Sequence, residues 1–236
     1  MLTPDEVNGY AGLMAAPWDE LSDRILRDMV RRIVKAGGVT TTAQWQSYRA
    51  EALGASRAYL LRQMDQIVQQ LSPQEAAVFA QAMKQAYGID LRDAAAAGRT
   101  LTPLGESEEA QQIIQSGYRR TMNTLYNLTR TRAVMGNQNL LETTQRQLAY
   151  HLDMAHADAL SGAFSSDDSA RRALNELAAK GVGAITYPSG HVDTLDVVVL
   201  RATRTGINQT AGEITRHNAD VLGLSLIHIS EPMRPY

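Results

Sequence analysis

The stretch Gly183-Ala-Ile-Thr-Tyr-Pro-Ser-Gly-His191, followed by Arg201-Ala-Thr-Arg-Thr-Gly-Ile-Asn-Gln-Thr210, says most about the fold. Residues 184–187 have the composition of a short strand, and Pro188-Ser-Gly190 has that of a turn. A short return strand after the turn would complete a small β-hairpin. A long helix that runs to about Leu222 is expected to follow it.

Upstream of this stretch the pattern is helical. Apolar residues between Asp19 and Lys35 recur at helical spacing, and Gly37-Gly38 is a stop signal. Thr3-Pro-Asp-Glu6 is a capping box that predicts a helix start near the N-terminus. Further helices are predicted at residues 42–53, 57–71, 73–86, 90–97, 107–133, 137–160 and 168–180. The fold class is therefore mainly α, with a multi-helix N-terminal part, then the hairpin and long helix that begin an incomplete α+β module.

The predicted organisation has three parts. Residues 1–162 form a helical N-terminal domain, and residues 163–223 form the start of the C-terminal α+β module. The last part, 224–236, contains Leu-Ser-Leu-Ile-His-Ile-Ser-Glu-Pro-Met-Arg234, which resembles the translation of a sequencing-library adapter with Met233 in place of Thr. We expect that these residues are an adapter-derived artefact and that the native reading frame is truncated at or near Gly223.

Composition limits the function classes. The chain has 236 residues, a net charge of -2 and 44% hydrophobic residues, so it can form a sizeable core without a global attraction to nucleic acid or membrane. It contains no Cys, which excludes disulfides and thiolate metal sites. No signal peptide or membrane-spanning segment is recognisable. A soluble protein made in the cytoplasm is expected.

Catalytic and metal-binding patterns are weak. His151-Leu-Asp-Met-Ala-His156-Ala-Asp158 contains potential ligands, but its two histidines lie about 140° apart around a helix. His151 and Asp158 share a helix face, yet two ligands from one helix do not make a site. Ser189-Gly-His191 lacks a carboxylate placed to orient the imidazole. We therefore expect no enzymatic activity, metal, cofactor or small-molecule substrate.

Two basic patterns are candidates for binding. Arg24, Arg27, Arg31 and Lys35 share about a quarter of a helix circumference and would contact phosphates or form a solvated face. On the last helix, Arg201, Arg204 and Asn208 share a face. They would grip carboxylates or phosphates, or else bond back to the Tyr187–His191 turn and orient the hairpin. The interrupting Gly206 and Gly212 are better explained by close packing than by helix stability.

The stretch quoted first, Gly183–His191 with Arg201–Thr210, resembles the C-terminal region of the phage minor capsid protein 2 family. Asp19–Ile33 is similar to the family's first strong helix, and Thr41-Thr-Ala-Gln-Trp45 to the start of the next one. Leu200-Arg201 departs from the paired basic residues that the family leads us to expect. The family-motif and interface candidates are Tyr187, Gly190, His191, Arg201, Arg204, Gly206, Asn208 and Gln209.

The resemblance implies a minor structural protein of a tailed-phage head. Such a protein would be located in the virion after an earlier stage in the host cytoplasm. It would be associated with the portal or other head proteins and act in capsid assembly or DNA packaging through protein contacts. Two alternatives remain. One is a head protein that contacts DNA, and the other is a fragment of an enzyme-bearing head protein whose catalytic part is missing.

Overall fold

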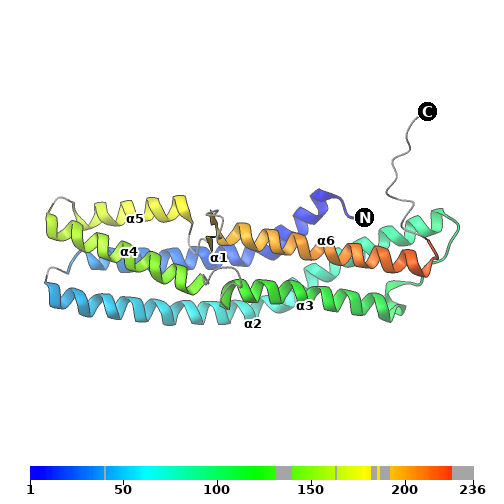
Figure 1. The fold of residues 1–236 in the computed structure, drawn as a ribbon, viewed down its shortest axis with the longest axis horizontal. Helices are drawn as coiled ribbons and strands as arrows, with labels where there is room; N and C mark the ends of the chain where they lie inside the picture. Colours follow the sequence, from blue (N-terminus) through cyan, green and yellow to red (C-terminus); the bar gives the residue numbers. More distant parts are fainter. Residues whose placement is uncertain (40, 131–139, 163, 182–184, 187–191, 225–236) are drawn as a thin grey trace, which may run out of the picture. The chain divides into compact units, whose positions relative to one another are not determined.

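The computed structural model describes residues 1–39, 41–130, 140–162, 164–181, 185–186 and 192–224. These residues are mainly helical, which confirms the predicted class (Figure 1). The predicted adapter-like tail lies almost wholly outside the described residues, so its origin stays a prediction.

Helix α1 spans Pro4–Ala36 and begins at the predicted capping box. The Thr3 backbone N–H donates to Glu6 Oε2 at 2.8 Å, and the Glu6 backbone N–H donates to Thr3 Oγ1 at 3.3 Å. The helix continues through Pro17, although proline lacks the N–H that an interior position needs. The predicted apolar face is buried at Leu21, Ile25, Met29 and Ile33.

Helix α2 spans Thr42–Ala96 without interruption, so the predicted division into four helices is wrong. The predicted breaks fall near Gly54, Pro73 and Gly88. A helical glycine costs only up to about 1 kcal/mol relative to alanine, and burial of one large apolar side chain contributes more. Side chains are buried on either side of Pro73, which explains why the local stop signals are overridden. Those side chains include Leu60, Met64, Phe79 and Met83.

The chain divides into two compact units that interleave along the sequence. Unit 1 comprises Met1–Met14, Pro73–Thr124 and Leu200–Tyr236, and unit 2 comprises Ala15–Ser72 and Leu125–Val199. Pro17 and Pro73, the two prolines inside helices, lie at or close to these boundaries. The sequence-based boundaries at 162 and 223 stay predictions.

Unit 1 contains a hydrophobic core built from α1, α2, α3 (Glu108–Arg130) and α6 (Leu195–Val221). A short 3₁₀ turn, η1 (Leu104–Glu106), precedes α3. The large buried side chains of this core come from α1, α2 and α6. Helix α3 contributes Ala110 and partly buried residues. The fully or nearly fully buried members include Val7, Met14, Phe79, Met83, Tyr87, Ile207 and Ile214.

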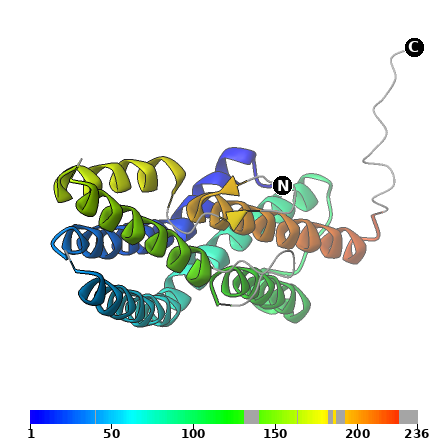
Figure 2. The same ribbon diagram turned by 60° about the vertical axis from the view of Figure 1, so that its left-hand side comes forward.

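Unit 2 contains α4 (Leu140–Ser161) and α5 (Ser166–Lys180), which lie side by side in both views (Figures 1 and 2). Helix α5 starts at a capping box in which Ser165 and Asp168 bond each other's backbone N–H groups. It ends at Gly181, as predicted. The buried apolar side chains of the two helices include Leu148, Leu152, Ala155, Ala173 and Leu177.

The predicted α+β module is not supported. The described strands are β1 (Ile185–Thr186) and β2 (Val192–Asp193), which pair antiparallel with Ile185 opposite Asp193. These two residue pairs belong to the connection between α5 and α6, and they are too short to form a sheet that could cover a helix. The predicted turn, residues 187–191, lies outside the described residues.

Helix α6 ends close to the predicted position. Gly223 has φ +64°, and the N–H of Leu224 donates to the carbonyl of Ala219 at 2.8 Å. This is a Schellman ending, in which a left-handed residue lets the chain satisfy the last carbonyls. Among the described helices, none combines the length and apolar character that crossing a membrane requires.

Candidate functional site

The structure places the predicted interface residues unequally. Tyr187, Gly190 and His191 lie outside the described residues. Arg201, Arg204, Asn208 and Gln209 lie on α6 in unit 1, and their side chains are exposed, whereas Gly206 is partly buried.

Gly206 is explained by close packing of α6 against α3. A Cβ atom on Gly206 would lie 2.9 Å from the Cβ of Thr121, and a Cβ on Gly117 would lie 2.9 Å from that of Thr210. Real Cβ atoms do not approach each other so closely, so glycine is required at both positions. We call these four residues the Gly–Thr clasp.

The clasp is reciprocal. Thr121 Oγ1 donates to the carbonyl of Gly117 at 2.9 Å, and Thr210 Oγ1 donates to that of Gly206 at 2.8 Å. Each helix therefore offers a glycine and, one turn later, a threonine that fills the space left by the partner's glycine. Because the later residue of one helix meets the earlier residue of the other, the helices run antiparallel at this contact.

Polar contacts add to the attachment of α6 within unit 1. Asp90 on α2 accepts hydrogen bonds from Asn218 Nδ2 at 2.8 Å and from Thr215 Oγ1 at 3.3 Å. Arg120 on α3 pairs with Glu213 at 2.5 Å. Together with the clasp, these bonds fix which side of α6 is exposed.

The exposed side of α6 includes a row of residues spaced four apart, Arg204, Asn208, Gly212 and Arg216, which we call the α6 row. Arg204, Asn208 and Arg216 are exposed, and their side chains have no hydrogen-bond or ion-pair partner among the described residues. A Cβ added to Gly212 would meet nothing within 4 Å. The close-packing explanation predicted for this glycine is therefore wrong within unit 1 as described.

The basic stripe of α1 is partly neutralised by its own helix. Arg24 pairs with Glu20 at 2.5 Å and also donates to Gln63 Oε1 at 3.0 Å. Arg27 pairs with Asp23 at 3.3 Å. Arg31 pairs with the buried Asp28 at 2.7 Å, but Asp28 also accepts two bonds from Arg32 at 2.8 Å. Carboxylates thus accompany three of the four predicted phosphate-contacting residues, Lys35 being the fourth.

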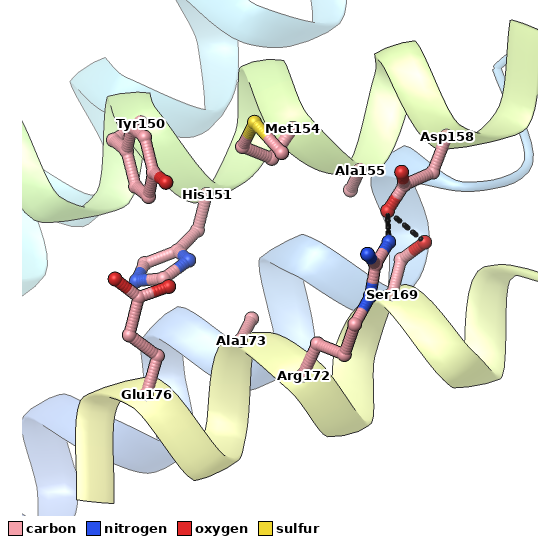
Figure 3. Close-up of a pocket in the computed structure, with 9 residues that line it drawn as sticks. All are labelled: Tyr150, His151, Met154, Ala155, Asp158, Ser169, Arg172, Ala173 and Glu176. Carbon is pink, nitrogen blue, oxygen red and sulfur yellow. Dashed lines mark hydrogen bonds and ion pairs between the residues drawn. The ribbon is translucent and has the colours of Figure 1, made fainter. Parts of the chain in front are cut away.

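A pocket of about 100 Å³ lies between α4 and α5 in unit 2 (Figure 3). Its lining includes two alanines, Ala155 and Ala173, whose short side chains leave the space between the helices unfilled. Tyr150 and Met154 line it from α4. Met154 is 42% exposed. Sequence analysis missed this pocket, because a pair of facing alanines is not recognisable before the pairing of the helices is known.

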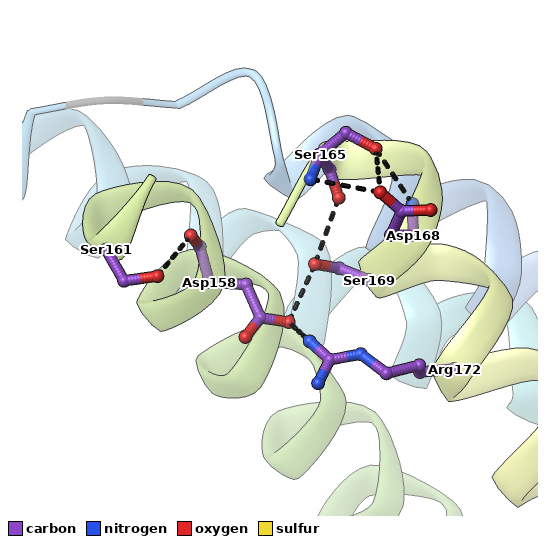
Figure 4. A network of polar contacts seen from close by, with 6 residues as sticks. All are labelled: Asp158, Ser161, Ser165, Asp168, Ser169 and Arg172. Carbon is purple, nitrogen blue, oxygen red and sulfur yellow. Dashed lines mark hydrogen bonds and ion pairs between the residues drawn. The ribbon is translucent and has the colours of Figure 1, made fainter. Parts of the chain in front are cut away.

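A polar network around Asp158 lines one end of the pocket (Figure 3), and Figure 4 shows its bonds. Asp158 pairs with Arg172, and Ser169 Oγ donates to its carboxylate at 2.7 Å. Burial raises the pKa of Asp158, but the bonds from Arg172 and Ser169 outweigh burial, and the pKa lies below its ordinary value. The carboxylate therefore stays charged and holds α5 against α4.

The other end of the pocket contains His151, whose ring faces the carboxylate of Glu176 (Figure 3). Burial lowers the pKa of His151, Glu176 opposes this shift, and Lys180 adds to it. Ser169 donates to Asp158 rather than to His151, so the pocket contains no hydroxyl activated by an imidazole. Its arrangement suits packing rather than acyl transfer.

The histidines and aspartates of α4 are used separately. His156 stacks on Trp45 with ring centroids 4.2 Å apart, whereas Asp153 forms a bidentate pair with Arg49 at 2.6 and 2.9 Å. In the part of the chain that the structure describes, no group of three or more His, Cys, Asp or Glu side chains is placed to hold a metal ion.

These features describe an α-helical protein whose ion pairs, among the described residues, lie within one helix or join two of its own helices. Comparison with known families adds the identity: the model of the family described as phage minor capsid protein 2 matches residues 2–235. The chain belongs to this family, as its resemblance led us to expect. The family indicates a structural role in the phage head, with the virion as location and other head proteins as partners. Neither the curated proteins nor the solved structures gave a match.

Proposed function

We propose that this protein is a portal-associated minor component of a tailed-phage head, which acts in capsid assembly or DNA packaging through protein contacts. Membership in a minor capsid family is the observation that supports the proposal most strongly. The α6 row is exposed, and the Gly–Thr clasp beside it fixes α6 against α3. A fixed, exposed row supports a docking role over catalysis. The enzyme alternative would need catalytic groups outside the described residues.

The test is a phage that carries a stop codon early in this gene. We expect heads assembled without the protein to differ in composition, portal content or DNA filling, and we expect the wild-type protein to sediment with procapsids. Mass spectrometry of purified procapsids and filled heads measures both. Normal heads of unchanged composition, with the protein absent from wild-type particles, would refute the proposal.

DNA contact is the weaker alternative, because Arg24, Arg27 and Arg31 have carboxylate partners on α1. Each phosphate contact lowers the logarithm of the binding constant by about 0.9 per unit of log salt concentration. A purified chain that binds duplex DNA with a slope of about -3 or steeper would favour this alternative. A chain without salt-dependent DNA binding would leave protein contacts as the function.

A further inference from the structure

We propose that the α6 row is the docking surface for an acidic helix of another head protein. This inference rests on the proposed structural role and names the surface and the chemistry of the partner. The row consists of Arg204, Asn208, Gly212 and Arg216, on the side of α6 that the clasp leaves exposed.

Charge selects the partner. Within the described residues, Arg204 and Arg216 have no carboxylate partner, in contrast to the paired arginines of α1. The nearby Glu213 is bound to Arg120. Asp220 continues the row beyond Arg216 and is exposed, but it forms no ion pair with Arg216 in the described structure. The row therefore offers two guanidinium groups that fit carboxylates in a bidentate manner.

Spacing selects a helix as the binding element. Residues four apart form one of the ridges by which helices interdigitate. From Arg204 to Arg216 this ridge rises about 18 Å and turns about 120° around the axis, so a partner helix must cross α6 at an angle to follow it. Gly212 lies in the middle of this ridge, where the absence of a side chain makes a notch between two cations. Glycines without close neighbours also occur at Gly9 and Gly12, so the glycine alone assigns no site. The site is assigned by Arg204 and Arg216, the two cations of the row.

A protein fits the row better than DNA does. DNA carries one phosphate charge per about 1.7 Å of its axis, counted over both strands and distributed around the duplex. The row has only two cations, and Glu213 and Asp220 lie on the adjacent turns. A helix that crosses α6 along the row and presents one carboxylate to each guanidinium group matches the number of the charges.

The decisive experiment uses the full chain and procapsids purified from a phage that lacks this gene product. The double variant R204E/R216E is expected to bind at least about tenfold more weakly, because charge repulsion at an interface weakens association. The matched control is R92E/R119E, which makes the same charge change at two exposed arginines of unit 1 outside the row. Circular dichroism should be unchanged for both, since all four side chains are exposed.

The variant R204K/R216K keeps both positive charges, loses the bidentate guanidinium geometry, and identifies the partner. It should bind more weakly than the wild-type chain and more tightly than R204E/R216E. Carbodiimide should couple its new amines to Asp or Glu residues of a head protein, which mass spectrometry then locates. Unchanged binding by R204E/R216E, or equal losses in it and the control, overturns the inference while leaving the head role intact. A loss seen only with naked DNA also overturns it. Failure of the wild-type chain to bind procapsids counts against the proposed function itself.

Discussion

Two helix pairs in this protein are held together by different physics. Helices α3 and α6 meet in unit 1 through the Gly–Thr clasp, whose shape sets the distance and register, and the Arg120–Glu213 pair adds a charge contact. Helices α4 and α5 meet in unit 2 around facing alanines, a pocket of about 100 Å³ and the Asp158–Arg172 pair. The first contact depends on glycines that no other residue can replace, and the second depends on charge.

The two helix contacts should therefore differ in how they respond to added atoms and to pH. A contact limited by shape is vulnerable to added atoms and insensitive to pH, because the clasp contains no titratable group. A contact held by ionised groups tolerates added volume in its pocket but responds to the protonation of His151 and Asp158. Each of the following variants tests one side of this contrast.

The largest effect is expected from Gly206→Ala. The new methyl group would overlap Thr121, so α6 must move away from α3. Overpacking of this kind costs about 1–3 kcal/mol, and the better helix propensity of alanine returns at most about 1 kcal/mol. We expect a net loss of about 2 kcal/mol, measured by urea unfolding. In the double variant with Thr121→Ala, which removes the nearest side-chain atoms, stability should partly recover; no recovery would mean that the clasp is not the cause.

A smaller loss is expected from Asp158→Ala in the α4–α5 contact. The substitution removes the bonds from Arg172 and Ser169 to a buried carboxylate. Bonds to charged groups contribute about 1.5–3 kcal/mol, but the side chain of Arg172 is 48% exposed and screening by water reduces its share. We expect about 1–2 kcal/mol. Asp167→Ala, at an exposed position on α5, should change stability by much less.

His151 should make the α4–α5 contact sensitive to mild acid. Its pKa in the folded protein lies below the ordinary value of 6.5, so the unfolded chain takes up the proton first as pH falls. The free energy of unfolding should therefore decrease as pH falls below about 6.5 and level off below the folded pKa. Asp158 and Glu176 have lowered pKa values and stay ionised in this range.

Hydrogen exchange between pH 7.5 and 5 measures this effect. Amides of α4 and α5 should lose protection, whereas amides of α3 and α6 at the clasp should not. His151→Gln should remove the loss in α4 and α5. If protection falls equally in both helix pairs, or persists as a pH effect in the variant, His151 is not the responsible group.

The sequence predicted local features well and partner-dependent features poorly. The Thr3–Glu6 capping box, the buried face of α1 and the glycine that ends α5 were correct, because each depends on residues a few positions apart. The breaks predicted near Gly54 and Pro73 were wrong, because packing along α2 outweighs local preferences. The hairpin predicted within the α+β module of residues 163–223 reduces to a pairing of two residues with two in the described chain.

The candidate sites show the same limit. Arg24, Arg27 and Arg31 share a face as the spacing predicted, but each has a carboxylate partner one turn away, and those carboxylates were visible in the sequence as well. The close packing of Gly206 was predicted, whereas its partner Thr121 lies 85 positions earlier and no local pattern indicates it. Pairings between distant helices therefore decide which exposed residues remain for a binding partner.

The smallest predicted effect, from Gly212→Ala, sharpens the contrast between glycines on one helix. The added methyl group meets nothing within 4 Å, so it brings only the better helix propensity of alanine, up to about 1 kcal/mol of added stability. Urea unfolding beside Gly206→Ala measures it, and the two substitutions should change stability in opposite directions. A destabilised Gly212→Ala would mean that this side of α6 is already covered within the chain, and the α6 row could then not serve as a free docking surface.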